Sequence, residues 1–410
     1  MEADTMKTFD KSSKLDNVLY DVRGPVVDEA ARMEADGLSI LKLNIGNPAP
    51  FGFNAPEEVI LDMRQSLWEC QGYSDSKGLF SARKAIMQYC QLKKIPGVTM
   101  DDIYTGNGVS ELINLSMQAL LNDGDEILIP APDYPLWTAT ATLAGGKVVH
   151  YICDEESDWN PDIADIRSKI TDKTKAIVII NPNNPTGVLY PKELLLEIIQ
   201  IARESGLLIF ADEIYDRLVM DGKQHISLAS LTEDVPVITL NGLSKSHCLC
   251  GYRCGWMVIS GPRELTEDYR QGIIQLTSLR LCANTMAQIV IPAALDDMDT
   301  PASMVRPGGR IYEQREATVR ELEKINGLSF VKNDAAFYVF PKLDVKKFNI
   351  TNDKQFAHDL LDVTNILLVP GSGFDWKDPD HFRIVMLPQA DILSDAIRRM
   401  GTFLDGYKQK

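Results

Sequence analysis

Six short apolar runs, rich in β-branched residues and separated by segments with helical periodicity, are the feature that most constrains the fold of this chain. The runs are EILIP (126–130), KVVHYI (147–152), AIVIIN (176–181), LLIFADE (207–213), PVITLN (236–241) and GWMVIS (255–260). Continuous apolar runs of this length are typical of strands that are buried on both faces. Helices are predicted over 110–121 and 191–205, and Gly206 gives the second one a C-terminal stop. The pattern predicts an α/β fold with a mostly parallel sheet, whose ligands bind beyond the carboxyl ends of the strands.

The last third of the chain has a different pattern. A helix-rich stretch over 310–326 leads into the short apolar runs LSFV, AFYVFP, ILLVPG and HFRIVML, and amphipathic helices are predicted over 353–363 and 390–406. This predicts a smaller α+β domain over 311–410, next to a large domain over 56–310. Residues 1–55, which are punctuated by proline and glycine, are expected to form an N-terminal arm and part of the small domain.

The composition limits the classes of partner. The chain of 410 residues carries 42 Lys and Arg against 58 Asp and Glu, and its net charge of −16 argues against a nucleic-acid or anionic-membrane binder. The start, MEADTMKTFDKSSKLDN, has no apolar signal-peptide core, and no apolar run reaches the roughly 18 residues of a membrane span. The seven cysteines include no Cys-x-x-Cys pair, which argues against disulfide and zinc frameworks. We therefore expect a cytoplasmic protein that binds neither nucleic acid nor membrane.

Polar side chains follow three of the predicted strands at the point where each strand ends. NPNNPTG supplies Asn184, ADEIYD supplies Asp212 and Tyr215, and NGLSK supplies Lys245. A single polar residue at such a position is most often a turn former or a helix cap. An amide, an acid, a phenol and an amine together at one edge of a parallel sheet favour a binding site instead.

The motifs NPNNPTG, ADEIYD and LSK followed by GYRCG resemble those of the fold-type-I aminotransferases that use pyridoxal 5′-phosphate, the aspartate aminotransferase superfamily. The similarity extends over nearly the whole chain. More narrowly, YDVRGP, LNIGNPAPFGF, GYSDSKG, GNGVSEL and PDYPLW resemble segments of the bacterial alanine (glutamate–pyruvate) aminotransferases. The resemblance implies a large cofactor-binding domain, with a mostly parallel sheet flanked by helices, and a smaller α+β domain.

The resemblance also implies chemical roles for the residues at the strand ends. Lys245 is the catalytic residue, which forms an imine with the cofactor and shuttles a proton from the Cα atom of the amino acid. Asp212 keeps the ring nitrogen of the cofactor protonated, so that the ring accepts the released electron pair. Tyr215 and Asn184 hydrogen-bond the phenolate oxygen of the ring. Tyr134 stacks on the ring face, and a core aromatic residue is the alternative interpretation of that position.

The phosphate of the cofactor needs anion-binding donors. GNGVSEL begins a helix after a turn, so the backbone N–H groups of Gly108, Val109 and Ser110 are expected to face the phosphate. A Gly-x-Gly segment before a helix, taken without its context, is more often a plain capping turn.

Side chains complete the phosphate site that the resemblance implies. Arg253 pairs with the phosphate, Ser244 adds a hydroxyl group, and Tyr73 reaches the phosphate from the neighbouring subunit of a dimer. The chain departs from the aspartate type at Gly242, where that type has a serine three positions before the lysine.

Arg383 lies inside the apolar run HFRIVML, where an unpaired guanidinium would be costly. By resemblance it binds the α-carboxylate of the substrate, with Asn184 and the backbone of Gly46 as helpers; a structural salt bridge is the alternative. Arg23 is the candidate for binding the distal carboxylate of glutamate, and Tyr20 is expected to cover the site as a lid. The alternative for Arg23 is a surface arginine in a mobile arm.

Cys248, Cys250 and Cys254 follow the lysine closely, but their spacing is not a recognised zinc spacing. We expect small buried thiols and no metal site.

The leading functional hypothesis is a ping-pong transamination, in which L-alanine and 2-oxoglutarate give pyruvate and L-glutamate through the Lys245 imine. The alternatives within the same fold are an aminotransferase with another donor, such as an aromatic or branched-chain amino acid, or a β-lyase acting on cystathionine. A non-enzymatic alternative is a ligand-sensing module fused to a DNA-binding domain, but no helix-turn-helix pattern precedes residue 20. The resemblance also implies a homodimer with shared active sites.

Overall fold

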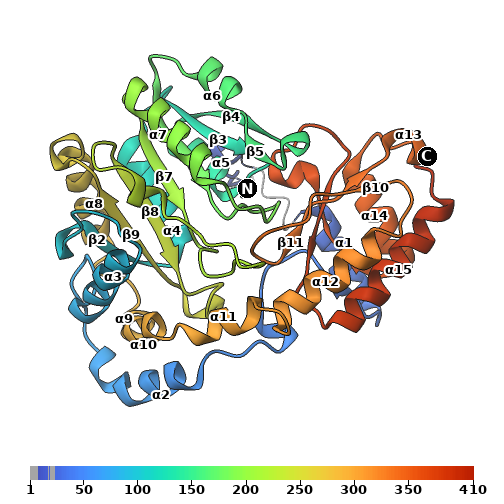
Figure 1. Cartoon of the computed structure of the whole chain (residues 1–410), viewed down its shortest axis with the longest axis horizontal. Coiled ribbons are helices and arrows are strands. Elements are labelled where there is room, and N and C mark those ends of the chain that lie inside the picture. Colours follow the sequence, from blue (N-terminus) through green and yellow to red (C-terminus); the bar gives the residue numbers. More distant parts are fainter. Residues whose placement is uncertain (1–7, 17, 19–23) are drawn as a thin grey trace, which may run out of the picture.

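The computed structural model describes residues 8–16, 18 and 24–410 (Figure 1). Tyr20 and Arg23, which are expected to contact the substrate, therefore lie outside the described residues. No helix of the described part is long and apolar enough to cross a membrane.

An eight-stranded sheet forms the centre of the larger part of the chain (Figure 1). Its strands are β2 (Ile103–Asn107), β3 (Glu126–Ala131), β4 (Lys147–Asp154), β5 (Asn160–Pro161), β6 (Thr174–Ile180), β7 (Leu208–Asp212), β8 (Val237–Gly242) and β9 (Cys254–Ser260). They are arranged in the order β2-β9-β8-β7-β6-β3-β4-β5. Strands β4, β3, β6, β7 and β8 run parallel, whereas β9 is antiparallel to both β8 and β2. The α/β prediction with a mostly parallel sheet is confirmed.

The six predicted strands are all present, with ends within two residues of those expected. Strands β2 and β5 were not predicted, because IYTGN has few apolar residues and β5 is only two residues long. The predicted helices over 110–121 and 191–205 are α4 (Val109–Leu120) and α7 (Lys192–Ser205). Gly206 ends α7 in the left-handed region, at φ +64°, where glycine is the least strained residue.

Helices cover both faces of this sheet, which explains why its strands are apolar without alternation. One face packs against α4, α5 (Leu136–Leu143) and α8 (Glu267–Leu279), and the other packs against α3 (Phe80–Leu92), α6 (Ile163–Lys169), α7 and α10 (Ile291–Asp296). In β6, Val178 and Ile180 belong to the first core, and Ile177 and Ile179 belong to the second. Each such side chain contributes about 1.5–3 kcal/mol when it is fully buried.

The last third of the chain forms a smaller unit of helices and short, mostly antiparallel strands, as the α+β pattern predicts. Its helices are α12 (Arg310–Leu322), α13 (Val345–Phe348), α14 (Asp353–Thr364) and α15 (Ala390–Gly406), so the helices predicted over 353–363 and 390–406 are confirmed. Its strands are β10 (Leu328–Ser329), β11 (Tyr338–Val339), β12 (Lys342–Leu343), β13 (Ile366–Leu367), β14 (Val369–Pro370) and β15 (Phe382–Val385). Strands β11, β15 and β14 form a three-stranded antiparallel sheet.

The N-terminal part of the chain packs on this smaller unit. Helix α1 (Pro25–Ala35) lies against α14, and β1 (Leu41–Lys42) pairs in parallel with β13. Val26, Ala30 and Met33 enter the same apolar core as α14 and α15. Helices α2 (Glu57–Ser66), α9 (Thr285–Ile289) and α11 (Asp299–Val305) continue along the lower edge of the molecule (Figure 1).

Candidate active site

A cavity of about 640 Å³ collects most of the residues that the sequence singled out. Its walls include Gly46, Val109, Ser110, Tyr134, Asn184, Asp212, Tyr215, Ser244, Lys245, Arg253 and Arg383. Gly108 precedes this wall as the N-cap of α4. Tyr73 is 81% exposed and lies outside this cavity of its own chain. Among the described residues, the charged side chains that line the cavity are three cations and one carboxylate, so an anionic ligand is favoured there despite the net charge of −16.

The sheet topology explains why these residues meet. Ile180, Asp212 and Leu240 pair across the adjacent parallel strands β6, β7 and β8, so the segments that follow these strands emerge at one edge. Strand β9 is antiparallel, so its first residues pair with the last residues of β8 and β2. Arg253, which precedes β9, is thereby brought to the same edge as Lys245.

The amine of Lys245 is held at the boundary between the sheet and the N-terminal segment. Its Nζ donates a hydrogen bond to the Gly46 carbonyl at 2.7 Å and lies 4.0 Å from Cys250 Sγ. The ring of Phe337 lies 6.0 Å from the same nitrogen. The Gly46 backbone, predicted as a substrate contact, therefore also positions the lysine.

Asp212 is a buried acid at the end of β7. Its carboxylate accepts hydrogen bonds from the Trp137 indole N–H at 3.3 Å and from the Ile214 backbone N–H at 3.3 Å. Burial raises the pKa of Asp212 to about 6, against the opposing effects of these hydrogen bonds and of Lys245. A cationic ligand group at this carboxylate would recover the free energy that burial costs.

The start of α4 offers hydrogen-bond donors that suit an anion. Gly108 has φ +80° and caps the helix, so the first N–H groups of α4 are available at the cavity wall. Arg253 donates from Nη1 to the Cys250 carbonyl at 2.7 Å, and a Cβ at Gly108 would lie 2.3 Å from Arg253 Nη2. A Cβ at Gly255 would lie 2.6 Å from the Val109 nitrogen. The two glycines thus let Arg253 and the α4 N-terminus approach each other.

Arg383 of β15 lies at the other side of the cavity and is 3% exposed. Its Nη1 donates to Asn184 Oδ1 at 2.8 Å, and its Nη2 donates to the Asn44 carbonyl. The guanidinium lies between the rings of Tyr338 and Phe374, at 4.6 Å and 4.5 Å from their centroids. These contacts fix the planar fork that a carboxylate binds with two hydrogen bonds.

Several further residues of the site were not predicted, and three of them contact its polar groups. Tyr338 and Cys250 line the cavity. Trp137 does not line it but donates a hydrogen bond to the Asp212 carboxylate. The expectation of buried thiols holds for Cys248 and Cys254 but is wrong for Cys250, which reaches the cavity because the turn before β9 points it there. PDYPLW offered one signal for Trp137, since it places a second aromatic residue one helical turn after Tyr134.

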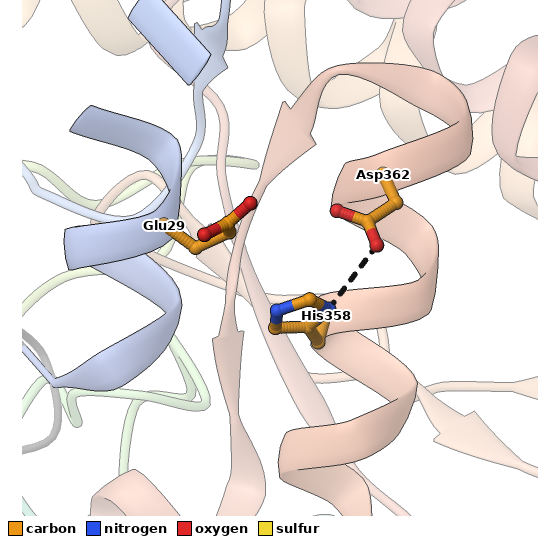
Figure 2. Close-up of side chains that lie close together, drawn as sticks. All are labelled: Glu29, His358 and Asp362. Atoms are coloured by element: carbon orange, nitrogen blue, oxygen red, sulfur yellow. Dashed lines mark ion pairs between the residues drawn. The ribbon is translucent and has the colours of Figure 1, made fainter. Parts of the chain in front are cut away.

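One group of histidine and carboxylate side chains in the described part of the chain has metal-ligand spacing. Glu29 of α1 faces His358 and Asp362 of α14 (Figure 2). Both oxygens of Glu29 accept hydrogen bonds from Arg32, and His358 Nδ1 lies 3.3 Å from Asp362 Oδ2. Glu29 is already paired with Arg32 and Asp362 with His358, so we assign no metal to this group.

Comparisons with known proteins give a consistent result. Residues 39–397 match the family described as aminotransferase class I and II. The chain is 55% identical to glutamate-pyruvate aminotransferase AlaA of Haemophilus influenzae over 98% of its own length and 100% of that protein. It is 51% identical to alanine aminotransferase of Mycobacterium bovis, over 98% of its length and 94% of that protein. The crystal structure of an aminotransferase from Escherichia coli, 54% identical, superposes with a TM-score of 0.97 over 98% of this chain and 100% of that one.

Proposed function

Because the chain belongs to the class I and II aminotransferases, we propose that it transfers an amino group between L-alanine and 2-oxoglutarate, giving pyruvate and L-glutamate. The observation that carries this proposal is the 51–55% identity, over 98% of the chain, to proteins named for alanine and for glutamate–pyruvate transfer. The cavity supports it, because Arg383 suits the α-carboxylate that all of these substrates carry.

The residues present fit pyridoxal 5′-phosphate, the cofactor of this family. Arg253 and the first N–H groups of α4 suit its phosphate, and Ser244 lies beside them on the cavity wall. Asp212 suits the ring nitrogen, because a buried carboxylate is stabilised by a cationic partner. When bound, the cofactor supplies an aldehyde that condenses with amines and a protonated ring that withdraws electrons from the Cα atom of the substrate.

Different side chains of the site then bind the substrate, transfer the proton and contact the cofactor ring. Arg383 holds the α-carboxylate, and the hydrogen bond from Arg383 to Asn184 fixes the orientation of both residues. The amine of Lys245 removes the Cα proton and would deliver it to the C4′ carbon of the bound cofactor, and the Gly46 carbonyl keeps that amine at the cavity wall. Asp212 keeps a proton on the ring nitrogen. Tyr134 covers the ring, and Arg23, with Tyr20 as a lid, is proposed to read the distal carboxylate.

We also propose that the chain forms a homodimer with shared active sites. Several large apolar side chains of the described residues are at least 68% exposed, and we call four of them the Trp68 patch: Trp68, Tyr73, Phe80 and Leu279. Hydrogen bonds tie their segments together, because Arg280 donates to the Ser76 carbonyl and the Leu79 N–H donates to Gln288. Exposed apolar patches of this kind mark protein interfaces. In such a dimer, Tyr73 would reach the phosphate site of the partner.

The test begins with the lysine. Borohydride reduction of the protein with bound cofactor, followed by peptide mapping, should leave a pyridoxyl group on Lys245; an adduct at another lysine would contradict the assignment. A panel of alanine, aromatic and branched-chain donors, with 2-oxoglutarate as acceptor, should show the highest kcat/KM for alanine. Preference for another donor, or release of pyruvate and ammonia from cystathionine, would overturn the substrate proposal.

A further inference from the structure

Tyr338 connects two parts of the site that have separate tasks. It begins β11, is 2% exposed and lines the cavity. Its hydroxyl oxygen lies 2.7 Å from the hydroxyl oxygen of Tyr215, and the guanidinium of Arg383 lies 4.6 Å from its ring centroid. The same side chain therefore contacts the residue proposed for the cofactor ring and the residue proposed for the substrate carboxylate.

The hydroxyl group of Tyr338 has little freedom to move. Tyr338 pairs with Val385 across β11 and β15, which anchors its backbone beside the strand of Arg383. A Cβ at Gly46 would lie 2.1 Å from the Tyr338 hydroxyl oxygen, so the backbone of Gly46 packs directly against that hydroxyl group. The rings of Phe337 and Tyr215 enclose the remaining edge, with centroids at 4.9 Å and 5.6 Å.

Each phenol has a single proton, so only one of the two hydroxyl groups donates in the hydrogen bond between them. If Tyr215 donates to Tyr338, its proton is used and it has none left for a ligand. If Tyr338 donates, the proton of Tyr215 is free to point into the cavity. We infer that Tyr338 is a positioning residue whose hydroxyl donates to Tyr215 and directs the Tyr215 proton at the phenolate oxygen of the cofactor; this rests on the function proposed above.

The charges around the pair favour this direction. A hydroxyl group that donates gains negative charge on its own oxygen, and the Tyr338 ring lies under the cation of Arg383. Burial raises the pKa of Tyr215 well above its ordinary value and outweighs the opposing charge of Arg383, so Tyr215 keeps its proton for donation. The negative charge of Asp212 acts on Tyr215 in the same sense.

The test is the pH titration of the visible absorption band of the protein with bound pyridoxal phosphate. Tyr338→Phe should raise the apparent pKa of that band by about 0.3 to 1 unit. Without the Tyr338 hydroxyl, Tyr215 donates less well to the phenolate oxygen of the cofactor, and that oxygen then binds the titrating proton beside it more tightly. The KM for alanine should change less than twofold, because the ring under Arg383 remains. A lower pKa would mean that Tyr215 donates to Tyr338, and an unchanged pKa would mean that the hydroxyl plays no part; either result overturns the inference.

A double-mutant cycle tests whether Tyr338 acts through Tyr215. Tyr215→Phe should raise the pKa further than Tyr338→Phe, and the double variant should match Tyr215→Phe alone. An additive shift would contradict action through Tyr215. Tyr312→Phe, a tyrosine whose ring lies beside Arg315 outside the cavity, is the matched control and should titrate like the unmodified protein. If the unmodified protein shows no titrating band, the proposed function fails; if only the variants fail to differ, the inference alone fails.

Discussion

The guanidinium of Arg383 is almost fully buried, and its partners include an amide oxygen, a backbone carbonyl and two aromatic rings. Burial of a cation is costly, and an anionic ligand with good hydrogen-bond geometry offsets that cost. The planar guanidinium offers two parallel N–H donors, which a point charge cannot reproduce. The residue therefore suits a carboxylate that is common to all amino-acid substrates.

Arg383→Lys should lower kcat/KM for alanine and for glutamate by the same factor, roughly a hundredfold. The reason is the loss of about 3 kcal/mol of charged hydrogen bonding, at 1.4 kcal/mol per factor of ten. Steady-state kinetics with both donors measures the effect. Arg399→Lys, which changes an exposed arginine of α15, is the control and should leave both values unchanged. A loss confined to glutamate would assign Arg383 to the distal carboxylate instead.

At the scale of elements, the approach of β9 to the N-terminus of α4 forms the anion site. Gly255 makes this approach possible, because a Cβ there would lie 2.6 Å from the Val109 nitrogen and 2.8 Å from the Gly108 carbonyl carbon. Both neighbours are backbone atoms, which cannot move aside as the end of a flexible side chain can. Gly255, the last residue of the Gly-Tyr-Arg-Cys-Gly segment, thus matters for the distance between two elements.

Gly255→Ala should separate β9 from α4, lower the free energy of unfolding by about 1–3 kcal/mol and weaken pyridoxal phosphate binding. Urea unfolding of the cofactor-free protein and a titration with the cofactor measure the two effects. Gly406→Ala is the matched control, because nothing lies within 4 Å of its Cβ position at the end of α15. Equal behaviour of the two variants would show that the contact is not tight.

At the scale of the whole molecule, a buried histidine joins the large sheet to the smaller unit. His381, just before β15, lies 2.7 Å from Asp380 through Nδ1 and faces Glu155, which follows β4, at 3.6 Å through Nε2. Lys342 pairs with the same two carboxylates. Burial alone would lower the pKa of His381, but the hydrogen bond to Asp380 and the charge of Glu155 outweigh it and raise the pKa above its ordinary value.

A histidine with a raised pKa in the folded state adds stability below its unfolded pKa of about 6.5, and this stability is lost as pH rises through the folded pKa. His381→Gln should therefore lower the free energy of unfolding by about 2 kcal/mol at pH 6, and the difference from the unmodified protein should shrink by pH 9. Urea unfolding at several pH values measures this difference, in which contributions common to both proteins cancel. A difference that is constant with pH would mean that His381 has the same pKa in the folded and unfolded protein.

The Trp68 patch also acts at the scale of the whole molecule. Replacement of Trp68 and Phe80 by glutamate should convert the proposed dimer to monomers, because buried charges would oppose association. Light scattering after size exclusion measures the mass. Val363→Glu is the control, since Val363 is 68% exposed on α14, away from the patch. If the unmodified protein is monomeric, or if the double variant stays dimeric, the proposed interface is wrong.

The sequence by itself determined the elements and the identity of several site residues. The six strands, the stop of α7 at Gly206 and the bounds of α15 follow from apolar periodicity and from the conformations open to glycine. These are properties of residues a few positions apart, so a short window of sequence contains them. The motifs at the strand ends identified Lys245, Asp212 and Asn184 before any contact between them was known.

Only the tertiary structure decided which residues touch one another. Tyr338 and Tyr215 are 123 positions apart, Lys245 and Gly46 are 199 apart, and Trp137 and Asp212 are 75 apart. The antiparallel direction of β9, which brings Arg253 to the edge of the parallel strands, has no signature in its own residues. Such contacts depend on how the layers of the whole chain pack, because the free energy that fixes them is shared among elements distant in sequence.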